Sequence, residues 1–159
     1  MPSVANPYFA EMASVIISEA NTKHYTTIVI DSLESEMNQR KSLLTLISRQ
    51  VDGIIAAPCG SDPTLFEEIN RQNIPIILID RFFEGTGLPY VTTNNYLGGV
   101  EGANFLIKNG HKDIICIQGA TASTPNKKRV AGYIDAMKTA GLDDQIRIVG
   151  NDFSIQNGY

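Results

Sequence analysis

The stretch from Ile74 to Asp80 reads IPIILID, an apolar and mostly β-branched run that ends at a carboxylate. It shows no alternation of polar and apolar residues, so it predicts a strand that is buried on both faces. Residues 112–119, KDIICIQG, show the same pattern. Two-sided apolar strands are typical of parallel sheets that helices cover on both sides.

Amphipathic segments separate these strands along the chain. In the segment 7–23, for example, Phe9, Ile16 and Ala20 recur at helical spacing. Helices are predicted at about 7–23, 34–49, 64–73, 95–110 and 125–140, and strands at 25–31, 51–58, 74–80, 90–93, 112–119 and 145–150. This alternation predicts an α/β fold, a doubly wound parallel sheet sandwich.

The pattern is interrupted once, near 85–111, where EGTGLPY precedes a helix that leads into GHKDI. We therefore expect a first lobe over 1–108 and the beginning of a second lobe over 109–159. The helix at 7–23 has no strand before it, and NDFSIQNGY at the end has the features of a helix start. The pattern is that of a fragment of a larger domain.

Composition narrows the function. The 159 residues are 43% hydrophobic with a formal net charge of −4, which indicates a globular chain and argues against a nucleic-acid-binding surface. No apolar run approaches the roughly 18 residues of a membrane span, and the start does not have a signal peptide's pattern. Cys59 and Cys116 stand far apart and are interpreted as reduced thiols, so we expect a cytosolic protein with no metal and no cofactor.

Ligands of open α/β sheets bind outside the carboxyl ends of the strands. The positions that this rule selects are Asn6, Tyr8, Phe9, Asp31, Ser32, Cys59 to Asp62, Asp80, Arg81, Thr93 to Asn95 and Thr121 to Arg129. Tyr8 and Phe9 are either a hydrophobic staple at a helix start or a stacking platform for a planar or sugar-like ligand. Both interpretations fit the residues alone.

The polar candidates also have two interpretations. Asp80 and Arg81 are either a surface ion pair or an acceptor beside a rigid fork of donors, which suits vicinal hydroxyls or a carboxylate. Of Asn94 and Asn95, one is expected to cap the helix at 95–109, which leaves the other to face a cleft. Arg129 lies near a helix start, where the dipole disfavours a cation, and this placement slightly favours a functional role.

Catalytic candidates are few. His24 and His111 both follow helix ends, where histidines commonly meet terminal carbonyls. Neither a G-x-S-x-G elbow nor an H-E-x-x-H helix nor a phosphate-binding glycine loop occurs in the sequence. The residues therefore predict a binding protein and not an enzyme.

Seven motifs together resemble the effector-binding domain of the LacI/GalR family of bacterial repressors, whose fold is that of periplasmic sugar-binding proteins. In chain order they are NPYF, VDGIIAAP, IPIILIDR, TTNNYLGG, LIKNGHKDIICIQG, STPNKKRVAGY and DFSIQNGY. Each motif is weak alone, but their order and spacing match the family over essentially all 159 residues.

The resemblance implies two lobes with a ligand cleft between them, and it implies roles for single residues. Tyr8 and Phe9 would stack on the effector and Asn6 would hydrogen-bond it. Asp80 and Arg81 match the pair that sugar-binding members place on ligand hydroxyls. Arg129 matches the arginine that holds the effector from the second lobe. Asn94 stands where the family most often has Asp, a departure that removes a charge.

By this resemblance the chain is the sensing part of a transcriptional repressor. A small effector, a sugar or a nucleoside, would bridge the lobes, and a homodimer would pass the change to operator DNA through an N-terminal helix-turn-helix outside these residues. Family members enter the NPYF loop from a central strand, which is also outside them, so we expect a less stable first lobe with unpaired strand edges.

Two other classes stay open. One is a solute-binding protein of an uptake system, which shares the lobes and the cleft. The other is a flavodoxin-like enzyme or a response-regulator-like module, which phosphate or flavin bound at residues 58–62 would favour. We expect no contact between this chain and a membrane.

Overall fold

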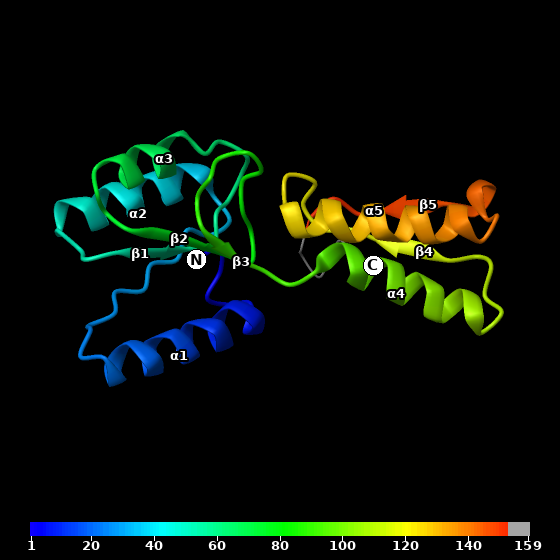
Figure 1. The fold of residues 1–159 in the computed structure, drawn as a ribbon, viewed down its shortest axis with the longest axis horizontal. Helices are drawn as coiled ribbons and strands as arrows, with labels where there is room; N and C mark the ends of the chain where they lie inside the picture. Colours follow the sequence, from blue (N-terminus) through cyan, green and yellow to red (C-terminus); the bar gives the residue numbers. More distant parts are fainter. Residues whose placement is uncertain (153–159) are drawn as a thin grey trace. The chain divides into compact units, whose positions relative to one another are not determined.

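The computed structural model describes residues 1–152, which form two compact units, Met1–Val91 and a second unit from Thr92 on (Figure 1). The first unit contains α1 (Pro7–Thr22), α2 (Glu36–Ser48), β1 (Ile54–Ala56), α3 (Thr64–Arg71), β2 (Ile76–Ile79) and β3 (Tyr90–Val91). The second unit contains α4 (Asn95–Lys108), β4 (Ile115–Ile117), α5 (Thr124–Thr139), the short 3-10 helix η1 (Asp143–Gln145) and β5 (Arg147–Val149).

All strand pairs in the described residues are parallel. In the first unit the order is β1-β2-β3, with Ile54 opposite Ile76 and Leu78 opposite Tyr90. In the second unit β4 pairs with β5, with Cys116 opposite Ile148. Parallel pairing needs a crossover. α3 lies in the crossover from β1 to β2, α5 lies in that from β4 to β5, and residues 80–89 connect β2 to β3 without a helix. The predicted α/β class with parallel sheets is confirmed.

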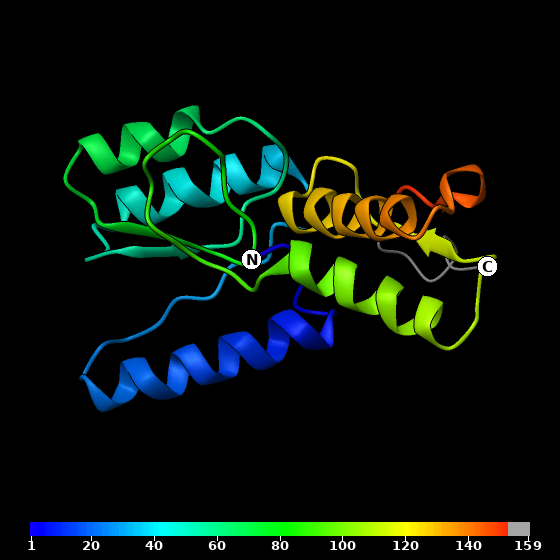
Figure 2. The ribbon, with the colours of Figure 1, turned by 45° about the vertical axis from the view of Figure 1, so that its right-hand side comes forward.

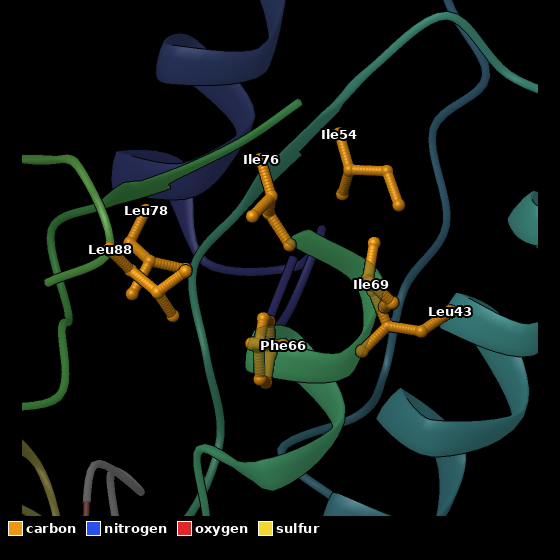
Figure 3. Close-up of a cluster of buried hydrophobic side chains, with 7 residues drawn as sticks. All are labelled: Leu43, Ile54, Phe66, Ile69, Ile76, Leu78 and Leu88. Atoms are coloured by element: carbon orange, nitrogen blue, oxygen red, sulfur yellow. The ribbon is translucent and has the colours of Figure 1, made fainter. Parts of the chain in front are cut away.

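The core of the first unit lies between β1, β2 and the helices α2 and α3. Phe66 and Ile69 of α3 and Leu43 of α2 point toward Ile76 and Leu78 of β2 (Figure 3). Ile69 and Leu78 are fully buried. Ile54 and Leu88 complete the cluster of seven side chains. β2 alternates buried and half-buried residues, so the predicted two-sided burial is only partly realised there.

The strand predicted at 25–31 is not formed. This segment is extended, but neither β1 nor β2 hydrogen-bonds to it. The Tyr25 amide at its start donates to the Ala20 carbonyl of α1, and its end bonds to the first residues of the chain. The Met1 amine donates to the Ile30 carbonyl, and the Ser32 amide donates to the Met1 carbonyl. A β-strand needs a neighbouring strand along its length, so β-branched composition alone does not make one.

An apolar cavity of about 810 Å³ lies in the first unit along this unpaired segment. Its wall comes from α1, from residues 25–30 and from β1, which contributes the half-exposed Ile55. In both ribbon views α1 lies away from β1 and β2, and the extended chain after it returns toward the sheet (Figures 1 and 2). α1 consequently buries only Phe9 completely.

In the second unit α4 and α5 pack closely, because glycines let their backbones approach. A Cβ atom at Gly99 would overlap the Arg129 carbonyl, and one at Gly132 would overlap the Tyr96 carbonyl. α4 therefore belongs with α5, and the units divide between Val91 and Thr92. The boundary expected at residue 108 lies later in the chain than this division, because the sequence pattern does not reveal where α4 packs.

The second core consists of Ala103, Ile114, Tyr133, Ala136 and Met137. The Tyr133 hydroxyl connects it to the sheet, since it donates to the Ile114 carbonyl at 2.7 Å and accepts from the Arg147 amide at 3.0 Å. Ile115 and Ile117 of β4 are 50% and 62% exposed. The predicted burial of β4 on both faces is therefore wrong, because the helices of the described residues cover one face.

Two further findings concern the described residues alone. None of their helices is both long and apolar enough to span a membrane. The helix start predicted in NDFSIQNGY lies outside them, apart from Asn151 and Asp152.

The contact between α4 and α5 gives a matched pair of mutations. Gly99→Ala is expected to lower the free energy of unfolding by about 1–3 kcal/mol, because the new methyl group meets backbone atoms that cannot move aside. Gly98→Ala, in the same helix but with open space around the new Cβ, should stabilise by up to about 1 kcal/mol through helix propensity. Urea unfolding followed by circular dichroism measures both. Equal effects would contradict the close helix contact.

Candidate functional site

The first part of the candidate site lies where β2 ends. Asp80 follows β2 with φ of 61°, a left-handed conformation that costs a non-glycine residue energy. The Tyr8 hydroxyl donates to Asp80 Oδ1 at 3.1 Å. Tyr8 is 48% exposed and the Asp80 side chain is 14% exposed, so an accessible aromatic ring lies beside a mostly buried carboxylate at the carboxyl end of the strand. The structure thus brings together two of the predicted site residues.

Phe9 has a different place from Tyr8. Its ring is 3% exposed and lies edge-on to Tyr8, with ring centres 5.2 Å apart. The Arg81 guanidinium carbon lies 5.6 Å from the centre of the Phe9 ring, within the range of a cation–π contact. Phe9 is therefore positioned to support Arg81 and Tyr8, which fits a packing role better than a stacking platform.

Asn6 acts as the N-cap of α1. Its side-chain oxygen accepts from the Tyr8 amide at 3.0 Å, and Pro7 fills the first helical position. A capping residue satisfies an amide that the helix leaves unpaired. Asn6 thereby fixes the start of the helix that carries Tyr8 and Phe9, and its side chain lies next to these two residues at that start.

Arg81 is held by an acidic partner that the sequence did not single out. Glu34 accepts two hydrogen bonds from it, Nη1 to Oε2 at 2.7 Å and Nη2 to Oε1 at 2.8 Å. The Arg81 residue is 7% exposed, whereas the Glu34 side chain is 40% exposed. Burial works to lower the pKa of Arg81, but the hydrogen bonds and charge of Glu34 outweigh it, so the pKa is raised. Arg81 stays a cation.

A buried polar layer lies beneath this pair. Cys59 Sγ is 3.3 Å from Ser32 Oγ and 3.9 Å from Glu34 Oε2. Gln39 binds the Cys59 backbone twice, accepting from its amide at 2.6 Å and donating to its carbonyl at 3.1 Å. Burial raises the pKa of the Cys59 thiol, against the opposing hydrogen bond of Ser32. A neutral buried thiol indicates a packing role and no nucleophile.

The loop that carries Glu34 is unusual in its backbone. Leu33 and Glu34 are consecutive residues with φ of 53° and 54°. Each such conformation costs of order 1 kcal/mol and persists only where surrounding bonds enforce it. Here the Leu33 amide donates to Asp31 Oδ1 at 2.8 Å, and the Glu34 amide donates to the Pro2 carbonyl at 2.7 Å. Asp31 also accepts from the Val4 amide at 3.0 Å, so it organises two loops.

The second unit contributes a separate group of residues. Asn94 is the N-cap of α4, and its side-chain oxygen accepts from the Leu97 amide at 3.0 Å. Arg129 Nη1 donates to Asn95 Oδ1 at 2.5 Å. Asn95 is nearly buried, whereas Arg129 is exposed. One of the two asparagines caps the helix as expected, namely Asn94, whereas Asn95 is buried against Arg129 and is not left to face a cleft.

Sequence reasoning missed Glu34 and Asn95 as partners of the two arginines. Glu34 follows Asp31 by three residues, after an apolar stretch, and that position at a strand-like end was the available signal. The sequence predicts Asn95 only as a helix cap or as a residue that faces a cleft. His24 and His111 are exposed after α1 and α4, as expected for residues that follow helix ends.

The chemistry offered is recognition by hydrogen bonds. The first unit offers an exposed tyrosine hydrogen-bonded to a mostly buried carboxylate, and the second unit offers an exposed guanidinium. Among residues 1–152 no group of three or more His, Cys, Asp or Glu side chains is placed to hold a metal ion. Carboxylates and arginines on rigid elements suit ligands that carry several hydroxyls.

Comparison with known proteins shows the family of the chain. Residues 1–158 match the family model described as periplasmic binding proteins and sugar binding domain of LacI family. The chain is 29% identical to the HTH-type transcriptional regulator DegA of Bacillus subtilis (strain 168), over 99% of the chain and 48% of that relative. It is 28% identical to the ribose operon repressor of Escherichia coli (strain K12), over 97% of the chain and 47% of that relative.

The chain is also similar in fold to a solved structure. The periplasmic binding protein/LacI transcriptional regulator from Alkaliphilus metalliredigens QYMF, complexed with D-xylulofuranose, is 25% identical with a TM-score of 0.85. The match covers 98% of the present chain and 56% of that structure. The chain spans about half the length of the curated relatives that it matches. It belongs to the family of periplasmic binding proteins and sugar-binding domains of LacI-type regulators.

Proposed function

We propose that this chain is the sensing domain of a LacI-type transcriptional repressor and that it binds a small sugar. The observation that carries the proposal is the exposed Tyr8 ring hydrogen-bonded to Asp80 at the end of β2. An aromatic face beside a carboxylate is suited to a sugar, whose C–H faces are apolar and whose hydroxyls donate hydrogen bonds. The D-xylulofuranose complex of the related regulator supports this ligand class.

The two units would each supply part of one effector site. We assign the first unit to the first lobe and the second unit to the beginning of the second lobe. Tyr8, Asp80 and Arg81 would contact the effector from the first lobe, with Asn6 and Phe9 supporting them. Arg129 would contact it from the second, with Asn94 at the same helix start. A ligand that contacts both lobes stabilises one relative orientation over others, which is the physical basis of coupling to a distant site.

The rest of the mechanism concerns parts of the protein outside this chain. A homodimer in the cytoplasm would pass the change in orientation to an N-terminal helix-turn-helix on operator DNA, with no membrane contact and no cofactor. The alternative is the sugar-binding protein of an uptake system. The coding sequence upstream of Met1 distinguishes them, because a helix-turn-helix there supports the repressor and a signal peptide supports the transport receptor.

Asp80 provides the first test. Asp80→Asn is expected to weaken binding of D-ribose or D-xylulose by about tenfold to a hundredfold, since a hydrogen bond to a charged group contributes about 1.5–3 kcal/mol. Isothermal titration calorimetry on the 159-residue chain measures it. The control is Asp52→Asn, an exposed carboxylate at the amino-terminal end of β1. A loss of affinity equal in both variants would contradict a role for Asp80, and absence of binding by the wild-type chain would contradict the proposal for these two sugars.

Arg129 provides the second test. Arg129→Lys keeps the charge but loses the planar fork, so affinity for the same sugar should fall by about tenfold. Lys127→Gln, an exposed residue two positions earlier on α5, should leave affinity unchanged. Unchanged affinity in Arg129→Lys would remove the second unit from the proposed site.

A further inference from the structure

Glu34 is the acidic partner of Arg81, and neither the sequence motifs nor the comparisons assign it a role. Its two oxygens meet both terminal nitrogens of the guanidinium, at 2.7 Å and 2.8 Å. This is the fork-to-fork geometry by which arginine binds a carboxylate or a phosphate of a ligand. Glu34 therefore occupies the face of Arg81 that an anionic ligand group would use.

The charges around Arg81 further disfavour an anionic ligand group at this position. Asp80 lies on the other side of the guanidinium, with Oδ2 3.9 Å from Nε, so two carboxylates flank one cation. Near Glu34 there are also the Asp31 carboxylate, the neutral Cys59 thiol and the Met1 amine, whose pKa is lowered by burial. An anionic group placed here would have to displace Glu34 or lie beside an excess of negative charge. Like charges at such distances repel each other.

The backbone holds Glu34 in this place. Its left-handed conformation is enforced by the hydrogen bond of its amide to the Pro2 carbonyl, and Ser32 bonds the Met1 carbonyl through both its amide and its hydroxyl. Because the Glu34 side chain is 40% exposed and Arg81 is buried, Glu34 lies on the accessible side of the pair. The side chain that a ligand meets first is thus the carboxylate.

We propose that Glu34 sets the charge specificity of the first unit: it occupies Arg81, so that this part of the site selects uncharged polyols over sugars that carry a carboxylate or phosphate there. The inference rests on the proposed function and deepens it. Glu34 is a specificity determinant that acts through Arg81 and through its own negative charge.

The test compares two sugars of similar size, D-ribose and D-ribonate, by isothermal titration calorimetry. The wild-type chain is expected to prefer D-ribose. In Glu34→Gln the neutral amide no longer forms an ion pair with Arg81 or repels an anion, so the ratio of the two affinities should move toward D-ribonate by about tenfold or more. A wild-type chain that binds D-ribonate as tightly as D-ribose would overturn the inference.

Two variants separate charge from structure. Glu34→Asp keeps the charge and should keep the wild-type preference, even if its affinities fall because the shorter side chain reaches Arg81 poorly. Glu68→Gln removes an exposed carboxylate on α3 and should leave the ratio unchanged. A ratio that moves equally in Glu68→Gln and Glu34→Gln would reflect net charge alone and would contradict the inference.

A second measurement needs no sugar binding. Inorganic phosphate is titrated while NMR follows the Arg81 Nε–H resonance, with circular dichroism confirming that the variant is folded. Phosphate should shift the resonance in Glu34→Gln and leave it unmoved in the wild-type chain. An equal response in both would overturn the role of Glu34. Failure of both sugars to bind, with this difference present, would instead count against the proposed function and support the effect of Glu34 on Arg81.

Discussion

Parallel pairing of β2 with its two neighbours is the constraint on which the candidate site depends. Parallel strands end at the same edge of a sheet, so the residues after them meet although they lie far apart in sequence. Asp80 and Arg81 follow β2, and Cys59 follows β1. The buried cluster of Phe66, Ile69 and Leu78 fixes β2 beneath them. The polar groups at this edge owe their positions to an apolar core.

The second unit positions its arginine by a different means. Gly99 and Gly132 allow α4 and α5 to touch through their backbones, and Arg129 lies on α5 at this contact. The start of α4, capped by Asn94, then places Asn95 against the Arg129 guanidinium. Two glycines and a helix cap thus determine where one guanidinium lies. Packing, and not a cluster of charges, defines this part of the site.

Sequence periodicity was sufficient for the fold class and for every described helix of more than one turn, because helical spacing and cap residues are local signals. It failed at 25–31, since a strand also needs a partner along its length, and at β4, whose outer face no described helix covers. The residues of the candidate site were predicted only in part, because local signals place some of them and tertiary contacts place the others. Asp80, Arg81 and Arg129 follow from their places after strands or at helix starts, whereas their partners Glu34 and Asn95 depend on tertiary contacts with no local pattern.

The hydrogen bonds of the first two residues have a consequence for motion. Met1 and Pro2 accept hydrogen bonds from Ser32 and Glu34, next to an extended segment that lacks ladder partners over residues 25–29. Hydrogen bonds beside a segment without ladder partners can break by local opening, which costs little free energy compared with global unfolding. Each time residues 1 and 2 detach, the left-handed backbone at Leu33 and Glu34 loses a bond that enforces it. The electrostatic character of the site at Arg81 is therefore tied to local opening at residues 1 and 2, which hydrogen-bond the loop that carries Glu34.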